Sequence, residues 1–154
     1  MKPKVRTCLI LHGRAEEAAR FYVSLIENSL FEGAFRPKPD GVALMVEFSL
    51  AGAPYQALND GPPDRPNGAA SISVLTADQA ETDRLWNALI ADGGAESRCG
   101  WLTDRFGVAW QIVPEILPRL LADADRAAGD RAFQAMLGMA RIDIAELEKA
   151  FRGV

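Results

Sequence analysis

The sequence predicts an α+β fold in which one strand–helix–strands unit occurs twice and a helical tail follows. The order of strand and helix signals starts again after a stretch rich in proline and glycine at residues 60–68. Two pairs of segments also align, Arg20–Ile26 with Arg84–Ile90 and Gly52–Leu58 with Gly107–Val113. A recurrence of this kind is typical of a duplicated structural unit.

The length and composition are those of one globular domain. The chain has 154 residues, 49% of them apolar and 25% charged, and 17 basic against 21 acidic residues give a net charge of −4. This balance lacks the basic surface of nucleic-acid-binding proteins, and no apolar run approaches the roughly 20 residues of a membrane helix. The first residues lack an export signal, so we expect a cytoplasmic protein. We divide the single domain into a first module at 1–59, a connector at 60–68, a second module at 69–113 and a tail at 114–154.

The first module begins with a buried strand and an amphipathic helix. Val5–Leu11 is apolar and rich in strand-forming residues, and Gly13 ends it. Gly13 is also the expected N-cap of a helix that runs to about Ile26, because apolar residues recur there at helical spacing. Residues 30–36 carry only a weak signal.

A hairpin completes the first module. Apolar and polar residues alternate over Val42–Leu50, which predicts a strand with one buried face. Ala51–Pro54 reads as a turn, and Pro54–Asn59 as the paired strand. The connector that follows, together with Asn59, forms either a lid over a site or a simple link.

The second module repeats this order with clearer helix signals. Ser71–Leu75 predicts a strand, and Asp78 with Glu81 forms a capping box for a helix that ends at Gly93 and Gly94. Two further strands are expected around a turn at residues 103–107; they are Glu96–Trp101 and Val108–Val113.

The tail reads as helical from Pro114 onward. Its last helix has a clear start, with Asp143 as N-cap for Glu146 and Ile142 able to contact Leu147. Short helices are not stable alone in water. The tail must therefore pack on the sheet units or on another subunit.

Four segments of the chain resemble the vicinal oxygen chelate superfamily, which includes glyoxalase I, bleomycin-resistance proteins and extradiol dioxygenases. They are Ala15–Ile26, Ala57–Pro62, Cys99–Pro114 and Gln134–Phe151. The resemblance is greatest to the PhnB-like branch, often labelled 3-demethylubiquinone-9 3-methyltransferase-like. It implies two βαβββ modules that form a partly open, mostly antiparallel barrel around a ligand cavity, and it implies a homodimer.

The resemblance also indicates where metal-dependent relatives hold their ion. Those positions fall on or near Thr7 and Ala69, and on Gln56 and Gln111. Only the two glutamines could bind an ion, and neutral amides without imidazole or thiolate are poor ligands for a divalent transition metal. We therefore expect no metal and no cofactor. Glu47 would add a carboxylate ligand, and so allow a metal, if its side chain faces the cavity. The alternative is a solvated carboxylate on a sheet edge.

Strand alternation makes the glutamines the preferred ligand contacts. Gln56 and Gln111 lie on the faces opposite Tyr55 and Trp110, so the aromatic rings are expected under the helices. The alternative for the glutamines is a set of hydrogen bonds that close the barrel. The expected apolar lining consists of Pro54, Leu58, Ala109 and Val113.

Residues around the turn of the second module have two readings each. Arg105 with Asp104 would grip a polar ligand group, or Asp104 would cap backbone N–H groups of the turn. Trp101 is either a stacking wall of the cavity or a packed aromatic residue. The candidate ligand-binding residues are therefore Thr7, Glu47, Gln56, Trp101, Arg105 and Gln111.

Other catalytic signatures are missing from the sequence. The single histidine, His12, reads as exposed at a strand end, and we expect Cys8 and Cys99 to be small packed thiols. The chain contains no Walker loop, no serine-histidine-aspartate set and no glycine-rich dinucleotide turn.

The sequence favours a metal-free protein that binds a small, partly apolar molecule. The alternative is an enzyme of the same superfamily, an isomerase, lyase, dioxygenase or group transferase, with a metal held by Glu47, Gln56 and Gln111. A third reading is an interaction module with a filled cavity. The expected partners are a small molecule and a second copy of the chain, without nucleic acid or membrane.

Overall fold

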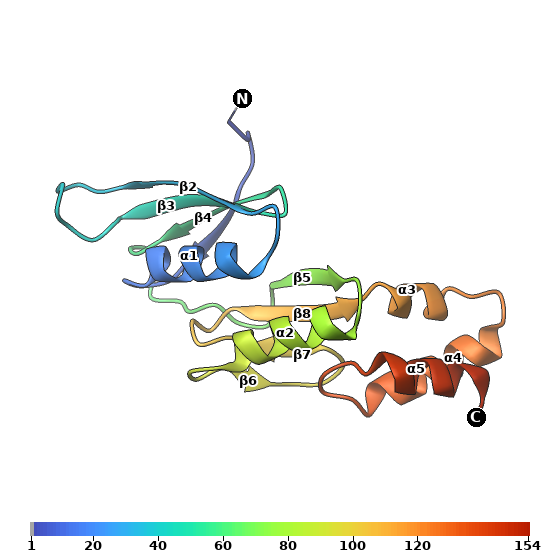
Figure 1. Ribbon diagram of the computed structural model, residues 1–154. Helices are drawn as coiled ribbons and strands as arrows, with labels where there is room; N and C mark the ends of the chain where they lie inside the picture. Colours follow the sequence, from blue (N-terminus) through green and yellow to red (C-terminus); the bar gives the residue numbers. More distant parts are fainter. Residues whose placement is uncertain (1) are drawn as a thin grey trace. The chain divides into compact units, whose positions relative to one another are not determined.

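A computed structural model describes residues 2–154, in which the chain forms two compact units, Met1–Pro66 and Asn67–Val154 (Figure 1). The boundary falls inside the predicted connector, and each unit contains one four-stranded sheet. The prediction that the two units make up a single domain stays a prediction.

The first unit is a βαβββ module. Its elements are β1 (Thr7–Ile10), α1 (Ala15–Leu25), β2 (Leu30–Phe35), β3 (Met45–Leu50) and β4 (Ala53–Leu58). The strand order is β1-β4-β3-β2, with β1 parallel to β4 and the other neighbours antiparallel. α1 packs on one face of this sheet, where the fully buried Tyr22 lies against Phe48 with 6.4 Å between ring centroids.

Asn59, and not Gly13, provides the side chain that caps α1. The N-cap position is Arg14, which makes no side-chain capping bond, so the Gly13 prediction was wrong. Instead the N–H of Ala15 donates to Asn59 Oδ1 at 2.8 Å, and Asn59 Nδ2 donates to the carbonyl of Ala43 at 2.7 Å. Asn59 therefore joins the end of β4 to the start of α1.

The second unit repeats the same topology. Its sheet and helix consist of β5 (Ser71–Thr76), α2 (Gln79–Ile90), β6 (Ala95–Glu96), β7 (Trp101–Thr103) and β8 (Ala109–Pro114). The order β5-β8-β7-β6 has β5 parallel to β8 and antiparallel pairs beyond, as in the first unit. The predicted α+β fold with two mostly antiparallel βαβββ modules and a helical tail is confirmed.

The predicted capping box of α2 is present, whereas one strand prediction of this module was wrong. Asp78 Oδ1 accepts from the N–H of Glu81 at 2.8 Å. The stretch Glu96–Trp101 is not one strand, because positive φ angles at Cys99 (57°) and Gly100 (82°) turn the chain between β6 and β7.

The tail forms three helices, α3 (Ile116–Leu121), α4 (Arg126–Leu137) and α5 (Ile144–Arg152). Asp143 caps α5 as predicted, with its Oδ1 accepting from the N–H of Glu146 at 3.0 Å. Leu117, Ile142 and Leu147 are buried together in a small apolar core of the tail. Contact between Ile142 and Leu147 in this core matches the expected start of the helix.

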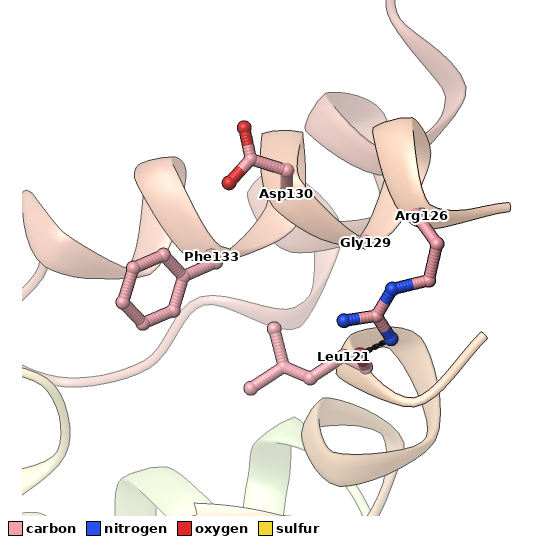
Figure 2. Close-up of a pocket in the computed structure, with 5 residues that line it drawn as sticks. All are labelled: Leu121, Arg126, Gly129, Asp130 and Phe133. Atoms are coloured by element: carbon pink, nitrogen blue, oxygen red, sulfur yellow. Dashed lines mark hydrogen bonds between the residues drawn. The ribbon is translucent and has the colours of Figure 1, made fainter.

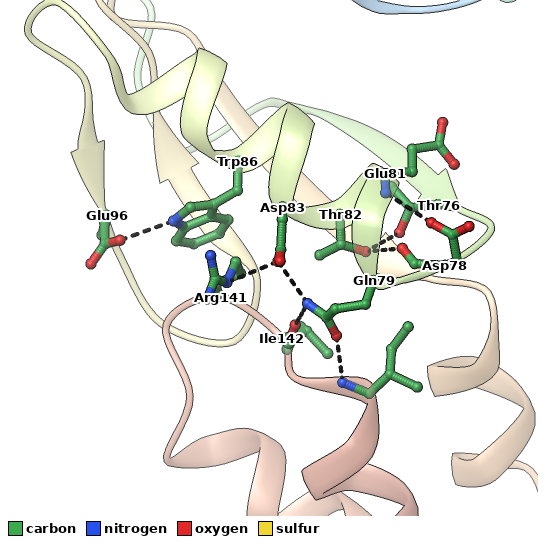
Figure 3. Close-up of polar contacts among 11 residues, drawn as sticks. Thr76, Asp78, Gln79, Glu81, Thr82, Asp83, Trp86, Glu96, Arg141 and Ile142 are labelled. Carbon is green, nitrogen blue, oxygen red and sulfur yellow. Dashed lines mark hydrogen bonds and ion pairs between the residues drawn. The ribbon is translucent and has the colours of Figure 1, made fainter.

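The tail packs on its own unit, which is one of the two predicted possibilities. Gln79 of α2 donates to the carbonyl of Ile142 at 3.1 Å and accepts from the N–H of Ile144 at 2.8 Å (Figure 3). Beside it, Arg141 Nε lies 3.2 Å from Asp83 Oδ1. The N–H groups of Cys99 and Gly100 also donate to tail carbonyls, both at 2.8 Å.

Candidate functional site

The candidate site of the first unit is the sheet face opposite α1, centred on Gln56 of β4. Gln56 pairs in register with Cys8 on β1 and Glu47 on β3, so the three side chains share this face. The buried Phe48, next to Glu47, points the other way, toward Tyr22 of α1. Gln56 is half-buried, and its carboxamide makes no hydrogen bond within residues 2–154.

The surroundings of Gln56 on this face are largely apolar. Cys8 is exposed, while Ile10, Met45 and Leu58 are half-buried on the same face. The amide therefore lies between the paired carboxylate of Glu47 on one side and half-buried apolar side chains on the other, and it is free to form hydrogen bonds with a small molecule.

Thr7 occupies a different face from the one its candidate role requires. It pairs with Tyr55 and so lies on the α1 side of the sheet, whereas Cys8 is the first-strand residue beside Gln56. The register therefore favours Cys8 over Thr7 as a ligand contact.

Glu47 faces the same side as Gln56 but is not free. β3 lies between β4 and β2, so Glu47 is not on a sheet edge. Its carboxylate lies 3.3 Å from Lys2 Nζ and 3.7 Å from Arg6 Nε. The Arg6 side chain is only 8% exposed; it also contacts the Glu32 carboxylate and donates to the carbonyl of Tyr55 at 2.9 Å.

Sequence reasoning missed Arg6. A charged residue inside the apolar stretch Val5–Leu11 was an available signal, because buried arginines are paired. The two carboxylates that pair with it, Glu32 and Glu47, come from strands far away in the sequence.

The donor set of the first unit does not fit a divalent metal ion. Glu47, the carboxylate nearest Gln56, is already neutralised by Lys2 and Arg6, so a dication would have to displace a largely buried guanidinium. Within residues 2–154 no three histidine, cysteine, aspartate or glutamate side chains are grouped to hold a metal. The residues present are better suited to hydrogen bonding than to metal binding.

The equivalent face of the second unit carries Gln111 on β8. Gln111 pairs in register with Ser73 on β5 and Trp101 on β7, so Trp101 lies beside it on the face away from α2. Its Nε2 donates to Ser71 Oγ at 2.8 Å. Val113, expected to line the cavity, packs against the apolar core of the tail.

Asp104 caps the turn before β8, one of its two predicted readings. Its Oδ1 accepts from the N–H groups of Phe106 and Val108 at 2.8 and 3.0 Å, and its Oδ2 accepts from Trp110 Nε1 at 2.8 Å. Trp110 is fully buried, as predicted. Arg105 reaches Asp92 at 3.3 Å and lies over the ring of Phe106, so the structure brings neither residue to Gln111.

The remaining candidates lie away from both glutamines. His12 is exposed, with Nε2 3.0 Å from the carbonyl oxygen of Asp64. Cys99 is half-buried in the turn that binds the tail. None of the helices in residues 2–154 is long and apolar enough to cross a membrane.

Comparison with known proteins assigns the chain to a family. The family model described as 3-demethylubiquinone-9 3-methyltransferase matches residues 3–113, from the segment before β1 to the last but one residue of β8. The chain belongs to this family. The resemblance to PhnB-like proteins of the vicinal oxygen chelate superfamily is thereby confirmed. The tail lies outside the part of the chain that the 3-demethylubiquinone-9 3-methyltransferase model matches.

Solved structures support the same fold. A putative 3-demethylubiquinone-9 3-methyltransferase, a PhnB protein from Bacillus cereus, is 27% identical with a TM-score of 0.66, and the match covers 73% of this chain and 99% of that one. A protein from Pseudomonas aeruginosa is 24% identical with a TM-score of 0.59, covering 74% and 98%. The fosfomycin resistance protein FosX from Mesorhizobium loti, 14% identical with a TM-score of 0.56 over 80% and 99%, shares the fold. No protein in the curated comparison matches.

In this member of the 3-demethylubiquinone-9 3-methyltransferase family, the burial of Tyr55 predicts that the stability of the first unit decreases at alkaline pH. Its ring stacks on Phe48 at 5.4 Å, and burial raises the pKa of Tyr55 above its ordinary value of 10.0. As pH rises, the Tyr55 hydroxyl ionises in the unfolded chain before it ionises in the folded one. The contribution of Tyr55 to the free energy of unfolding is therefore complete below about pH 10 and is lost as pH rises through the folded pKa. We expect Tyr55→Phe to remove this part of the loss, measured as urea midpoints by circular dichroism on either side of about pH 10. An unchanged pH dependence in the variant would contradict the assignment.

Proposed function

We propose that the protein binds a small, neutral, partly apolar molecule without a metal ion, on the sheet face that carries Gln56. The observation that carries the proposal is the unpaired, half-buried carboxamide of Gln56, which lies next to the half-buried apolar side chains of Met45 and Leu58. Its oxygen accepts and its nitrogen donates, so it would bind a ligand that has both kinds of group. On the second unit, Gln111 and Trp101 form a related pair of an amide and an aromatic ring.

The charges beside Gln56 favour a neutral ligand. Lys2 and Arg6 carry two positive charges and Glu32 and Glu47 two negative ones, and they are paired with each other. An anion would compete with the carboxylates for Arg6 and would meet their repulsion. We propose binding rather than the methyl transfer in the family name because the chain has no glycine-rich turn of the kind that nucleotide-like methyl donors commonly use.

Benzamide is a suitable probe, since it combines an amide with an apolar ring, and benzoate is its charged counterpart. Cys8 reports on the site because its thiol is exposed on the face of Gln56. We expect benzamide, but not benzoate, to slow alkylation of Cys8 by iodoacetamide, measured by mass spectrometry of the peptide that contains it. Cys99, which lies in the tail-binding turn, is the internal control.

We expect Gln56→Leu to weaken benzamide binding by about tenfold, because it removes both hydrogen-bonding groups and keeps the apolar surface. Asn87→Leu is the matched control, since it removes an exposed carboxamide from α2. Binding constants from ligand-observed NMR would measure both effects. The proposal fails if Gln56→Leu and Asn87→Leu bind benzamide equally, or if metal analysis finds one tightly held divalent ion per chain.

A further inference from the structure

Four charged side chains form a cluster beside Gln56. Glu47 is the neighbour of Gln56 on β3, and its carboxylate lies 3.3 Å from Lys2 Nζ and 3.7 Å from Arg6 Nε. Arg6 also pairs with the carboxylate of Glu32. We refer to Lys2, Arg6, Glu32 and Glu47 as the charge cluster. Its two positive and two negative groups balance, so the charge cluster has no net charge.

The two cations of the charge cluster are held differently. The side chain of Arg6 is 8% exposed, contacts Glu32 and donates to the carbonyl of Tyr55 at 2.9 Å, so it is a fixed part of the sheet. The side chain of Lys2 is 85% exposed and reaches the cluster through its contact with Glu47. Exposed ion pairs of this kind contribute little to stability. Lys2 can therefore be replaced without disturbing the sheet, whereas Arg6 cannot.

Lys2 decides the charge of the face that carries Gln56. Arg6 contacts Glu32 more closely than Glu47, from which it lies 3.7 Å, so it balances only one of the two carboxylates. Without Lys2 the charge cluster would carry one net negative charge, located mainly on Glu47. Glu47 is 24% exposed and neighbouring strands are about 4.8 Å apart, so this charge would act directly on a molecule bound at Gln56.

We propose that Lys2 is a specificity-determining residue of the Gln56 face and excludes cationic ligands from it. Its ammonium group occupies the Glu47 carboxylate, with which a ligand cation would otherwise pair, and its own charge repels that cation. The inference rests on the proposed function and deepens it, because one exposed lysine then selects a neutral ligand against a cation of the same shape.

Benzamide and benzamidine test this selection because they have nearly the same shape, while the amidine is a cation. We expect Lys2→Met to lower the ratio of the dissociation constant of benzamidine to that of benzamide by about fivefold, measured by ligand-observed NMR at low ionic strength. The ratio is the informative quantity because partial unfolding would weaken the binding of both ligands together. Lys2→Arg keeps the positive charge and should keep the ratio of the wild type.

Two further variants remove a positive charge elsewhere. Lys4→Met removes one from the same exposed segment, two residues from Lys2. Arg126→Met removes one from the other unit, where Arg126 lines a cavity of about 270 Å³ formed by residues of α3 and α4 (Figure 2). Both variants have the net charge of Lys2→Met, and neither should lower the ratio as Lys2→Met does.

Alkylation of Cys8 measures the charge of this face without a bound ligand. Cys8 is exposed and lies in one row with Gln56 and Glu47, two strand spacings or about 10 Å from Glu47. We expect Lys2→Met to raise the rate with cationic (2-bromoethyl)trimethylammonium about twofold relative to the rate with neutral iodoacetamide. Comparing two reagents cancels any change in the thiol that affects both. Cys99, which belongs to the other unit, is the internal control.

The outcomes separate this inference from the proposed function. If benzamide does not bind to the wild-type chain, the proposed function fails and the inference fails with it. The inference alone is overturned if benzamide binds but Lys2→Met leaves either the dissociation-constant ratio or the alkylation ratio as in the wild type. It is also overturned if Lys4→Met or Arg126→Met changes both ratios as much as Lys2→Met does.

Discussion

Replacing Asp104 with alanine is expected to lower the free energy of unfolding of the second unit by about 2 to 5 kcal/mol. The carboxylate is only 2% exposed and accepts from two backbone N–H groups and from the indole of Trp110. Alanine would remove the carboxylate that accepts from the buried N–H groups of Val108 and Trp110. The turn before β8, and with it the position of Gln111, depends on these bonds.

Tryptophan fluorescence during urea unfolding would measure this loss. All three tryptophans lie in the second unit, so the signal reports on that unit alone. Glu148→Ala is the control, because it removes a 42% exposed partner of Arg152 from helix α5 and should cost less than about 1 kcal/mol. Equal losses in the two variants would contradict a buried structural role for Asp104.

Gly100→Ala is expected to destabilise the second unit by a similar amount, about 2 to 5 kcal/mol, for a steric reason. Gly100 has a φ of 82°, and an added Cβ would lie 2.7 Å from the carbonyl oxygen of Ile112 and 3.2 Å from Ile142 Cγ1. The substitution would therefore separate β8 from the turn that binds the tail. Trp101, directly after Gly100, would move with it.

Gly93→Ala is the matched control for this substitution. Gly93 also has a positive φ, 111°, but an added Cβ would have no neighbour within 4 Å. It should therefore show only the backbone cost, about 1 to 2 kcal/mol. Urea unfolding followed by tryptophan fluorescence compares the two variants. If both lose the same stability, the close contact with Ile112 and Ile142 is not what requires glycine at position 100.

The elements with a strong side-chain pattern were predictable from sequence. Alternation over Val42–Leu50 placed Phe48 in the core, and the alignment of Gly52–Leu58 with Gly107–Val113 corresponds to the equivalent strands β4 and β8. β2 escaped prediction because its register shifts between Phe31 and Gly33, which breaks the alternation. The α1 cap was missed because Asn59, which supplies it, is distant in the sequence.

The candidate site was predictable only in part. Strand alternation was sufficient to place Gln56 and Gln111 opposite the helix-covered faces. Alternation did not predict the ion pairs of Glu47 with Lys2 and Arg6, because these contacts form only when the sheet is folded. For Asp104, capping of the local turn was one of two predicted readings, whereas its hydrogen bond with the indole of Trp110 was not predicted.

The hydrogen bonds that attach the tail to the second unit involve mainly the main chain of the tail. A single side chain, Gln79, binds the main chain on both sides of Asp143, and two N–H groups of the 99–100 turn bind two more carbonyls. These bonds depend mostly on backbone groups of the appended segment and little on its side chains. None of these bonds comes from β4 or β8, the strands that carry the glutamines, so the main-chain attachment of the tail places no demand on the residues of those two strands.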